Sequence, residues 1–121
     1  MTDHELNILL AEVAKLIPEV VEHPRGGNCT VYVDNVHEEV TAKDDWTPLI
    51  DHNQMALVRA GLREKGYVFG SYWWGDEYTA FVGQPSRLHP LEYKWRREAK
   101  NKTQELRAFA LAVAQMKGEQ L

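Results

Sequence analysis

The hydrophobic positions of this chain recur with two periods, one typical of helices and one typical of strands. Near the N-terminus the apolar residues lie three or four positions apart, which predicts one face of an amphipathic helix: Leu6, Leu9, Leu10, Val13, Leu16 and Ile17. Thr2 and Glu5 have the spacing of a capping box, so we expect the helix to start there. Pro18 has no amide hydrogen for a further turn, so we expect the helix to end at or just beyond Ile17.

The middle of the chain contains a strand pattern, an acidic segment and a second helix pattern. Residues 29–33 are mostly β-branched or aromatic, which predicts a strand of the sheet. Residues 34–51 are rich in acidic side chains and predict a surface loop that Trp46 holds to the core. A second helix is expected to start after Asp51, its N-cap residue, and to end at Gly66.

Residues 66–83 predict an aromatic β-hairpin closed by a two-residue Gly-Asp turn. Side chains alternate along a strand, which places Trp73 on one face of the hairpin and Trp74, with Tyr72, on the other. Both faces are largely apolar. We therefore expect helices to cover both of them.

The last third of the chain is less regular until a final helix. Leu91–Trp95 alternates apolar and charged residues as an edge strand does, while residues 94–102 are also compatible with a helix. A final apolar helical face starts after Thr103, its expected N-cap, with Gly118 past its end. Together the patterns predict one α+β domain over residues 1–121. Its small antiparallel or mixed sheet contains the aromatic hairpin and is covered by helices on both faces, as a three-layer α/β/α arrangement.

Three segments of the chain are similar to the phage ABA sandwich proteins, a family of phage and prophage proteins of unknown function. They are Trp46-Thr47-Pro48-Leu49 before the second helix, the hairpin around Trp73-Trp74, and residues 102–112 of the final helix, which are rich in small and apolar side chains. The resemblance implies a sandwich fold and a phage or prophage origin, and it brings no catalytic residues. The basic insert at residues 87–102 departs from it.

Charge is separated along the chain. Residues 1–86 carry 6 basic and 14 acidic side chains, whereas residues 87–102 carry 6 basic and 2 acidic ones. Such a separation attracts charged partners at low salt and favours contact between two copies, so we expect a homodimer. The net charge of −4 disfavours nucleic acid as the main ligand, because that affinity depends largely on neutralising phosphates.

No arrangement typical of a catalytic, metal or phosphate site occurs in the sequence. Cys29 is the only cysteine, the five histidines lack the spacing of a helical zinc site, and no glycine-rich phosphate loop is followed by Lys-Ser or Lys-Thr. We therefore expect a non-enzymatic protein with no cofactor and no metal. No apolar run approaches the roughly 20 residues of a membrane span, and no secretory signal is found, so the expected location is the cytoplasm of a bacterial host.

Aromatic and charged side chains supply the candidate binding residues. They are Lys94, Trp95, Arg96 and Arg97 of the basic segment, Trp73 and Trp74 of the hairpin, and Asp44 and Asp45 of the acidic loop. The basic segment suits a host protein with an acidic surface. We expect the protein to bind and inhibit a host protein, such as a component of an antiviral defence system. The alternatives are a binder of a small nucleotide-type ligand and a structural or assembly protein of a phage.

Overall fold

The computed structural model describes residues 2–35, 38–86 and 92–120. Over these residues the protein contains the helices α1 (Asp3–Val13), α2 (His52–Glu64) and α3 (Glu105–Gln120) and two antiparallel sheets. Sheet A consists of β1 (Ile17–Glu22), β2 (Asn28–Asp34) and β3 (Glu39–Ala42), and sheet B of β4 (Val68–Trp74), β5 (Glu77–Pro85) and β6 (Tyr93–Asn101). A short 3-10 helix, η1 (Lys43–Asp45), follows β3. The α+β class predicted from the sequence is therefore confirmed.

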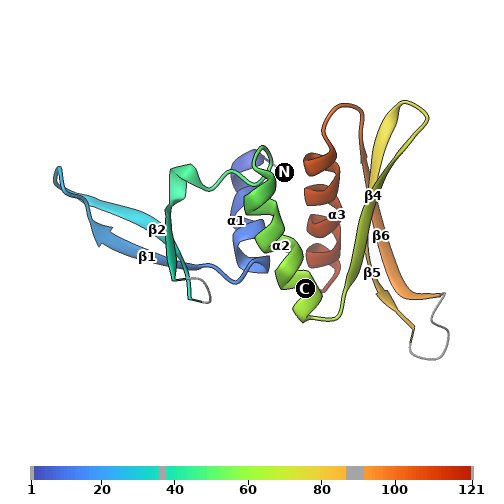
Figure 1. Ribbon diagram of the computed structural model, residues 1–121, viewed down its shortest axis with the longest axis horizontal. Helices are drawn as coiled ribbons and strands as arrows, with labels where there is room; N and C mark the ends of the chain where they lie inside the picture. The colour runs from blue at the N-terminus through green and yellow to red at the C-terminus, as the bar shows by residue number, and fades with distance from the viewer. Residues whose placement is uncertain (1, 36–37, 87–91, 121) are drawn as a thin grey trace.

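The helices lie between the two sheets (Figure 1). Helix α3 packs on sheet B, α1 and α2 pack together, and sheet A lies at the far end of the molecule. The expectation of one sheet with helices on both faces is wrong. Each strand pairs only with its neighbour in sequence, in the orders β1-β2-β3 and β4-β5-β6, and α2 separates the two sets. Residues 29–33 therefore form part of sheet A and do not pair with the hairpin.

Helix α1 starts where the sequence predicts and ends earlier. The Thr2 hydroxyl accepts a hydrogen bond from the Glu5 amide at 3.2 Å, as expected of its cap. The helix stops at Val13, and Lys15 adopts a left-handed φ of 60°. Ile17 then begins β1, which the sequence analysis assigned partly to this helix and otherwise missed. The β-branched residues of β1 favour an extended chain, and pairing with β2 supplies its hydrogen bonds.

The segment before α2 is a network that positions the helix. The indole nitrogen of Trp46 donates to the Asn7 carbonyl of α1 at 2.8 Å, and its ring meets Tyr32 edge-on. The Asp51 carboxylate accepts from the Asn53 and Gln54 amides, which confirms the predicted cap. The prediction of a loop throughout residues 34–51 is wrong, because residues 39–42 form β3.

The final helix starts later and extends further than predicted. The Asn101 side chain accepts from the amides of Thr103 and Gln104 at 3.1 and 3.0 Å, and α3 begins at Glu105. Gly118 lies inside the helix. The sequence left strand and helix open for residues 91–102. The structure has a strand, β6, from Tyr93 to Asn101. Residues 87–91, including the first residue of the predicted strand, lie outside the described part of the chain.

The core lies where α3 meets sheet B and where the three helices meet. Several of its apolar side chains are almost fully buried: Leu6, Leu10, Met55, Val58, Leu62, Val82, Phe109 and Val113. Phe109 contacts Phe69 of β4 edge-on, with 5.6 Å between ring centroids. Gly61 of α2 faces the Val13 carbonyl of α1 so closely that a Cβ would overlap it, and this allows the two helices to touch. None of the helices within the described ranges is long and apolar enough to span a membrane.

Candidate interaction surface on sheet B

Sheet B has an inner face toward α3 and an outer face that points away from the helices. The pairing registers assign these side chains to the outer face: Val68, Gly70, Tyr72 and Trp74 of β4, Glu77, Thr79, Phe81 and Gly83 of β5, and Arg96, Glu98 and Lys100 of β6. Tyr93 joins them, because its ring lies over Gly83. The inner face buries Ala80, Val82 and Ala99 as part of the core shared with α3.

The outer face is covered partly by its own aromatic rings. A Cβ on Gly70 would lie 2.9 Å from the Phe81 ring, and a Cβ on Gly83 would lie 2.8 Å from the Tyr93 ring. The two glycines therefore leave room for the rings to lie flat across neighbouring strands. Phe81 and Tyr93 also meet edge-on, with 6.2 Å between their centroids. These rings cover part of the outer face, on which none of the described helices packs.

Arg96 lies on the outer face of the edge strand β6, opposite Gly83 of β5, and aromatic rings hold it there. Its guanidinium carbon lies 4.2 Å from the Phe81 centroid and 5.2 Å from the Tyr93 centroid. Its Nη2 atom pairs with the Glu98 carboxylate at 2.7 Å. Cation–π contacts of this kind contribute about 0.5–2 kcal/mol, more as the pair is desolvated. Its Nε atom is buried and has no hydrogen-bond partner among the described residues.

The end of the β4–β5 hairpin leaves large aromatic surface uncovered. Trp74 is 77% exposed and Tyr72 is 43% exposed, both on the outer face. Glu77 lies 3.9 Å from Lys100 across the sheet. Exposed aromatic side chains bordered by charged ones are more common in protein–protein contacts than on the rest of a protein surface.

The structure places the residues of the basic segment on two opposite faces of sheet B. Arg96 points outward, whereas Trp95 and Arg97 lie on the inner face, because neighbouring residues of a strand alternate. Trp95 meets Tyr67 edge-on at 5.2 Å and donates to the Gln84 side chain at 3.0 Å. Arg97 lies 5.9 Å from the Trp95 ring and donates to the carbonyl of residue 96 at 2.9 Å. Both therefore support the inner side of the sheet.

Lys94 and the two tryptophans of the hairpin have different surroundings. Lys94 is exposed at an irregularity in which β6 has one more residue than β5. Trp73 and Trp74 point to opposite faces, and Trp73 meets Tyr78 edge-on with 4.5 Å between centroids. Of the predicted candidates, only Arg96 and Trp74 are thus assigned to the outer face by the strand registers.

The two acidic candidates lie far from sheet B, in η1. Asp44 lines a pocket of about 150 Å³ together with His4, Asn7, Ile8, Tyr32, Lys43, Trp46 and Thr47. The Oδ1 atom of Asn7 is buried there without a hydrogen-bond partner in the described structure. The neighbouring Asp45 accepts a hydrogen bond from Gln54 through its backbone carbonyl. Burial and then the Glu12 carboxylate raise the pKa of Tyr32 above its ordinary value.

The sequence analysis did not select Phe81 and Tyr93 as site residues. The available signal was the alternation of strand faces, combined with Gly70 and Gly83, which leave space for rings on adjacent strands. That signal requires the pairing register of β5 with β6, and this register contains an irregularity that alternation alone does not predict.

No group of three or more metal-ligating side chains was found among the described residues. Comparisons with protein-family models, with curated proteins and with solved structures found no match. The similarity to the phage ABA sandwich proteins therefore stays a prediction from the sequence.

Proposed function

We propose that this protein is a non-enzymatic binding module that recognises another protein through the outer face of sheet B. The observation that carries the proposal is the uncovered aromatic surface at Tyr72 and Trp74, on the same face of sheet B as the Arg96 stack. Tryptophan, tyrosine and arginine dominate the binding energy of protein interfaces. Arg96 is already held by Phe81 and Glu98, so its side chain would lose little conformational entropy on binding a partner.

The partner we propose is a host protein that is inhibited by the binding, such as an antiviral-defence component in the bacterial cytoplasm. This narrower proposal rests on the resemblance to phage proteins. An acidic partner surface would meet Lys94, which is exposed, and Lys100, which is exposed and lies 3.9 Å from Glu77. It would gain less from Arg96, whose charge is paired with Glu98, or from Arg97 on the inner face.

The alternative of a nucleotide-type ligand has weaker support. Aromatic rings suit a base, but a phosphate also needs cations in reach. Arg96 is paired with a carboxylate and Arg97 lies on the opposite face of the sheet. The alternative of a phage structural or assembly protein would use the same outer face and differs only in the partner.

The two hairpin tryptophans provide a matched test. Tagged protein is used to isolate a partner from host lysate, and the purified partner is titrated against wild type, Trp74→Ala and Trp73→Ala by calorimetry. Trp74 lies on the outer face and should act as an anchor, so its loss should weaken binding by at least about 30-fold. Trp73 faces the other way and should change affinity by less than about threefold, within the range of non-anchor contacts.

Thermal unfolding of both variants controls for loss of structure, because Trp73 packs on Tyr78. Equal losses of affinity, or no loss in Trp74→Ala, would refute the outer face as the interface. Parallel titration with a panel of nucleotides tests the ligand alternative. Saturable nucleotide binding that Trp74→Ala abolishes, with no protein partner retained, would replace the proposal by that alternative.

A further inference from the structure

Strand β1 is an edge strand whose residues are all exposed. It is the first strand of sheet A, and each of its six residues is accessible to solvent. The exposed positions include the apolar side chains of Ile17, Val20 and Val21, the second of them 69% exposed. The β1–β2 hairpin extends away from the helices (Figure 1). An accessible edge strand can pair with another strand, although Pro18 supplies no amide donor to such a pairing and Glu19 and Glu22 favour a partner of opposite charge.

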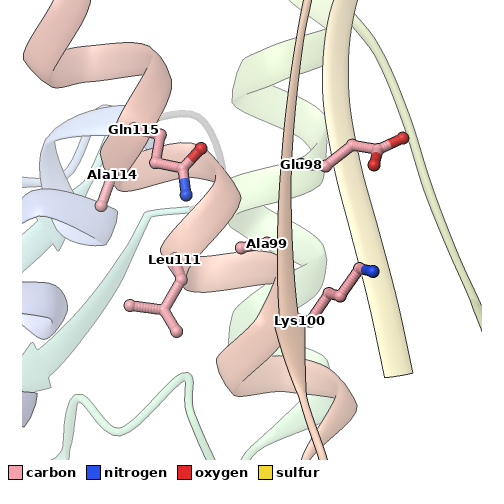
Figure 2. Close-up of a pocket in the computed structure, with 6 residues that line it drawn as sticks. All are labelled: Glu98, Ala99, Lys100, Leu111, Ala114 and Gln115. Carbon is pink, nitrogen blue, oxygen red and sulfur yellow. The ribbon is translucent and has the colours of Figure 1, made fainter. Parts of the chain in front are cut away.

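A second open edge lies on the opposite side of the molecule. Strand β6 is the last strand of sheet B and is nine residues long. Beside it lies an open groove of about 640 Å³ between β6 and α3, which is lined by Glu98, Ala99, Lys100, Leu111, Ala114 and Gln115. Figure 2 shows Ala99 pointing toward α3, while Glu98 and Lys100 point away from it. The groove therefore offers an apolar floor next to an available strand edge.

The two edges carry opposite charge. Strand β1 contains Glu19 and Glu22 and no basic residue, whereas β6 contains four basic residues and one acidic residue. Pairing β1 with another β1 would bring glutamates together, which is unfavourable. Pairing β1 with β6 brings unlike charges together. A six-residue strand of about 20 Å also fits within a nine-residue strand of about 30 Å.

We propose that two copies of this protein form a dimer in which β1 of each copy extends sheet B of the other along β6. The elongated molecule carries the two edges at opposite ends (Figure 1). In the proposed dimer the two copies lie side by side in opposite directions, so that a two-fold axis relates two identical contacts. Ile17 and Val21, which share one face of β1 with Glu19, would then contact the groove floor formed by Leu111 and Ala114. This inference concerns the strand edges and is independent of the function proposed for the outer face.

Charge reversal with exchange tests the pairing. One variant carries Glu19→Lys and Glu22→Lys, and the other carries Lys94→Glu and Lys100→Glu. Each reversal places like charges along both contacts, so each variant alone should have a dimer dissociation constant raised by at least about tenfold. An equimolar mixture restores unlike charges at both contacts and should recover the dimer. Analytical ultracentrifugation measures all three samples, and circular dichroism checks their folding.

A matched control reverses two exposed acidic residues away from β1, with Asp44→Lys and Asp45→Lys in η1. This variant has the same change in total charge as the β1 variant and should remain dimeric. Wild-type dimerisation should weaken as salt rises, because exposed charges are screened over about 8 Å at physiological ionic strength.

Several outcomes would overturn the inference. The wild type could be monomeric at high concentration and low salt, or the β6 variant could dimerise like wild type. The control variant could dissociate as the β1 variant does, or the equimolar mixture could stay monomeric. A β6 variant that stays dimeric while the β1 variant dissociates would point to pairing of β1 with a surface other than β6. The Trp74→Ala variant should still dimerise, so failure of the dimer and failure of the outer-face interface are measured separately.

Discussion

Replacing Gly61 by alanine tests how closely α1 and α2 approach each other. The new Cβ would overlap the Val13 carbonyl oxygen and lie 3.0 Å from the carbonyl carbon. Both are backbone atoms of α1, so no side-chain rotation can relieve the clash. The helices would have to separate, and the buried side chains around the crossing, including Leu10 and Leu62, would lose contacts.

Whether Gly61→Ala raises or lowers the free energy of unfolding depends on two opposing contributions. Alanine within a helix is favoured over glycine by about 1 kcal/mol, which by itself would stabilise the protein. Overpacking a close-packed site typically costs about 1–3 kcal/mol, and a clash with backbone belongs at the upper end of that range. We therefore expect Gly61→Ala to lower the free energy of unfolding by about 1–2 kcal/mol, a decrease of several degrees in the melting temperature.

Gly118→Ala is the matched control for this prediction. Gly118 also lies in a helix, but a Cβ there would meet nothing within 4 Å. The same substitution should then be neutral or stabilise by up to about 1 kcal/mol. Urea unfolding followed by far-ultraviolet circular dichroism measures both variants. A Gly61→Ala protein as stable as wild type would show that α1 and α2 do not touch at Val13.

Three further predictions concern the core, a helix cap and pH. Phe109→Ala should lower the free energy of unfolding by about 3–5 kcal/mol because Phe109 is buried between α3 and β4, and a urea-measured loss below about 1 kcal/mol would contradict that packing. Asp51→Ala should cost about 1 kcal/mol in the same assay by removing the cap of α2, and an unchanged stability would argue against the cap. Burial raises the pKa of Tyr32, because the folded protein favours the protonated hydroxyl. The contribution of Tyr32 to the free energy of unfolding is therefore complete below the ordinary pKa of 10.0 and should be lost as pH rises above it. Tyr32→Phe should lack this dependence in thermal melts, and an identical profile in both proteins would refute it.

Local hydrogen bonding explains which elements the sequence predicted correctly. The caps of α1 and α2 depend on residues two or three positions apart. The capping roles of Thr2 and Asp51 could therefore be predicted from the sequence. The C-terminal end of α1 could not be predicted in this way. Leu16 and Ile17 fit the spacing of the helical face, but pairing of Ile17 with Val33 makes the extended conformation more favourable.

The sequence by itself determined the α+β class, the caps of the first two helices and the apolar face of the last one. These features follow from short-range periodicity. The tertiary structure decided that the strands form two sheets, that Arg96 and Arg97 lie on opposite faces, and that Phe81, Tyr93 and Arg96 meet on one of them. The physical reason is that strand pairing joins distant segments through backbone groups that every residue carries, so residue types alone do not specify the partner or the register.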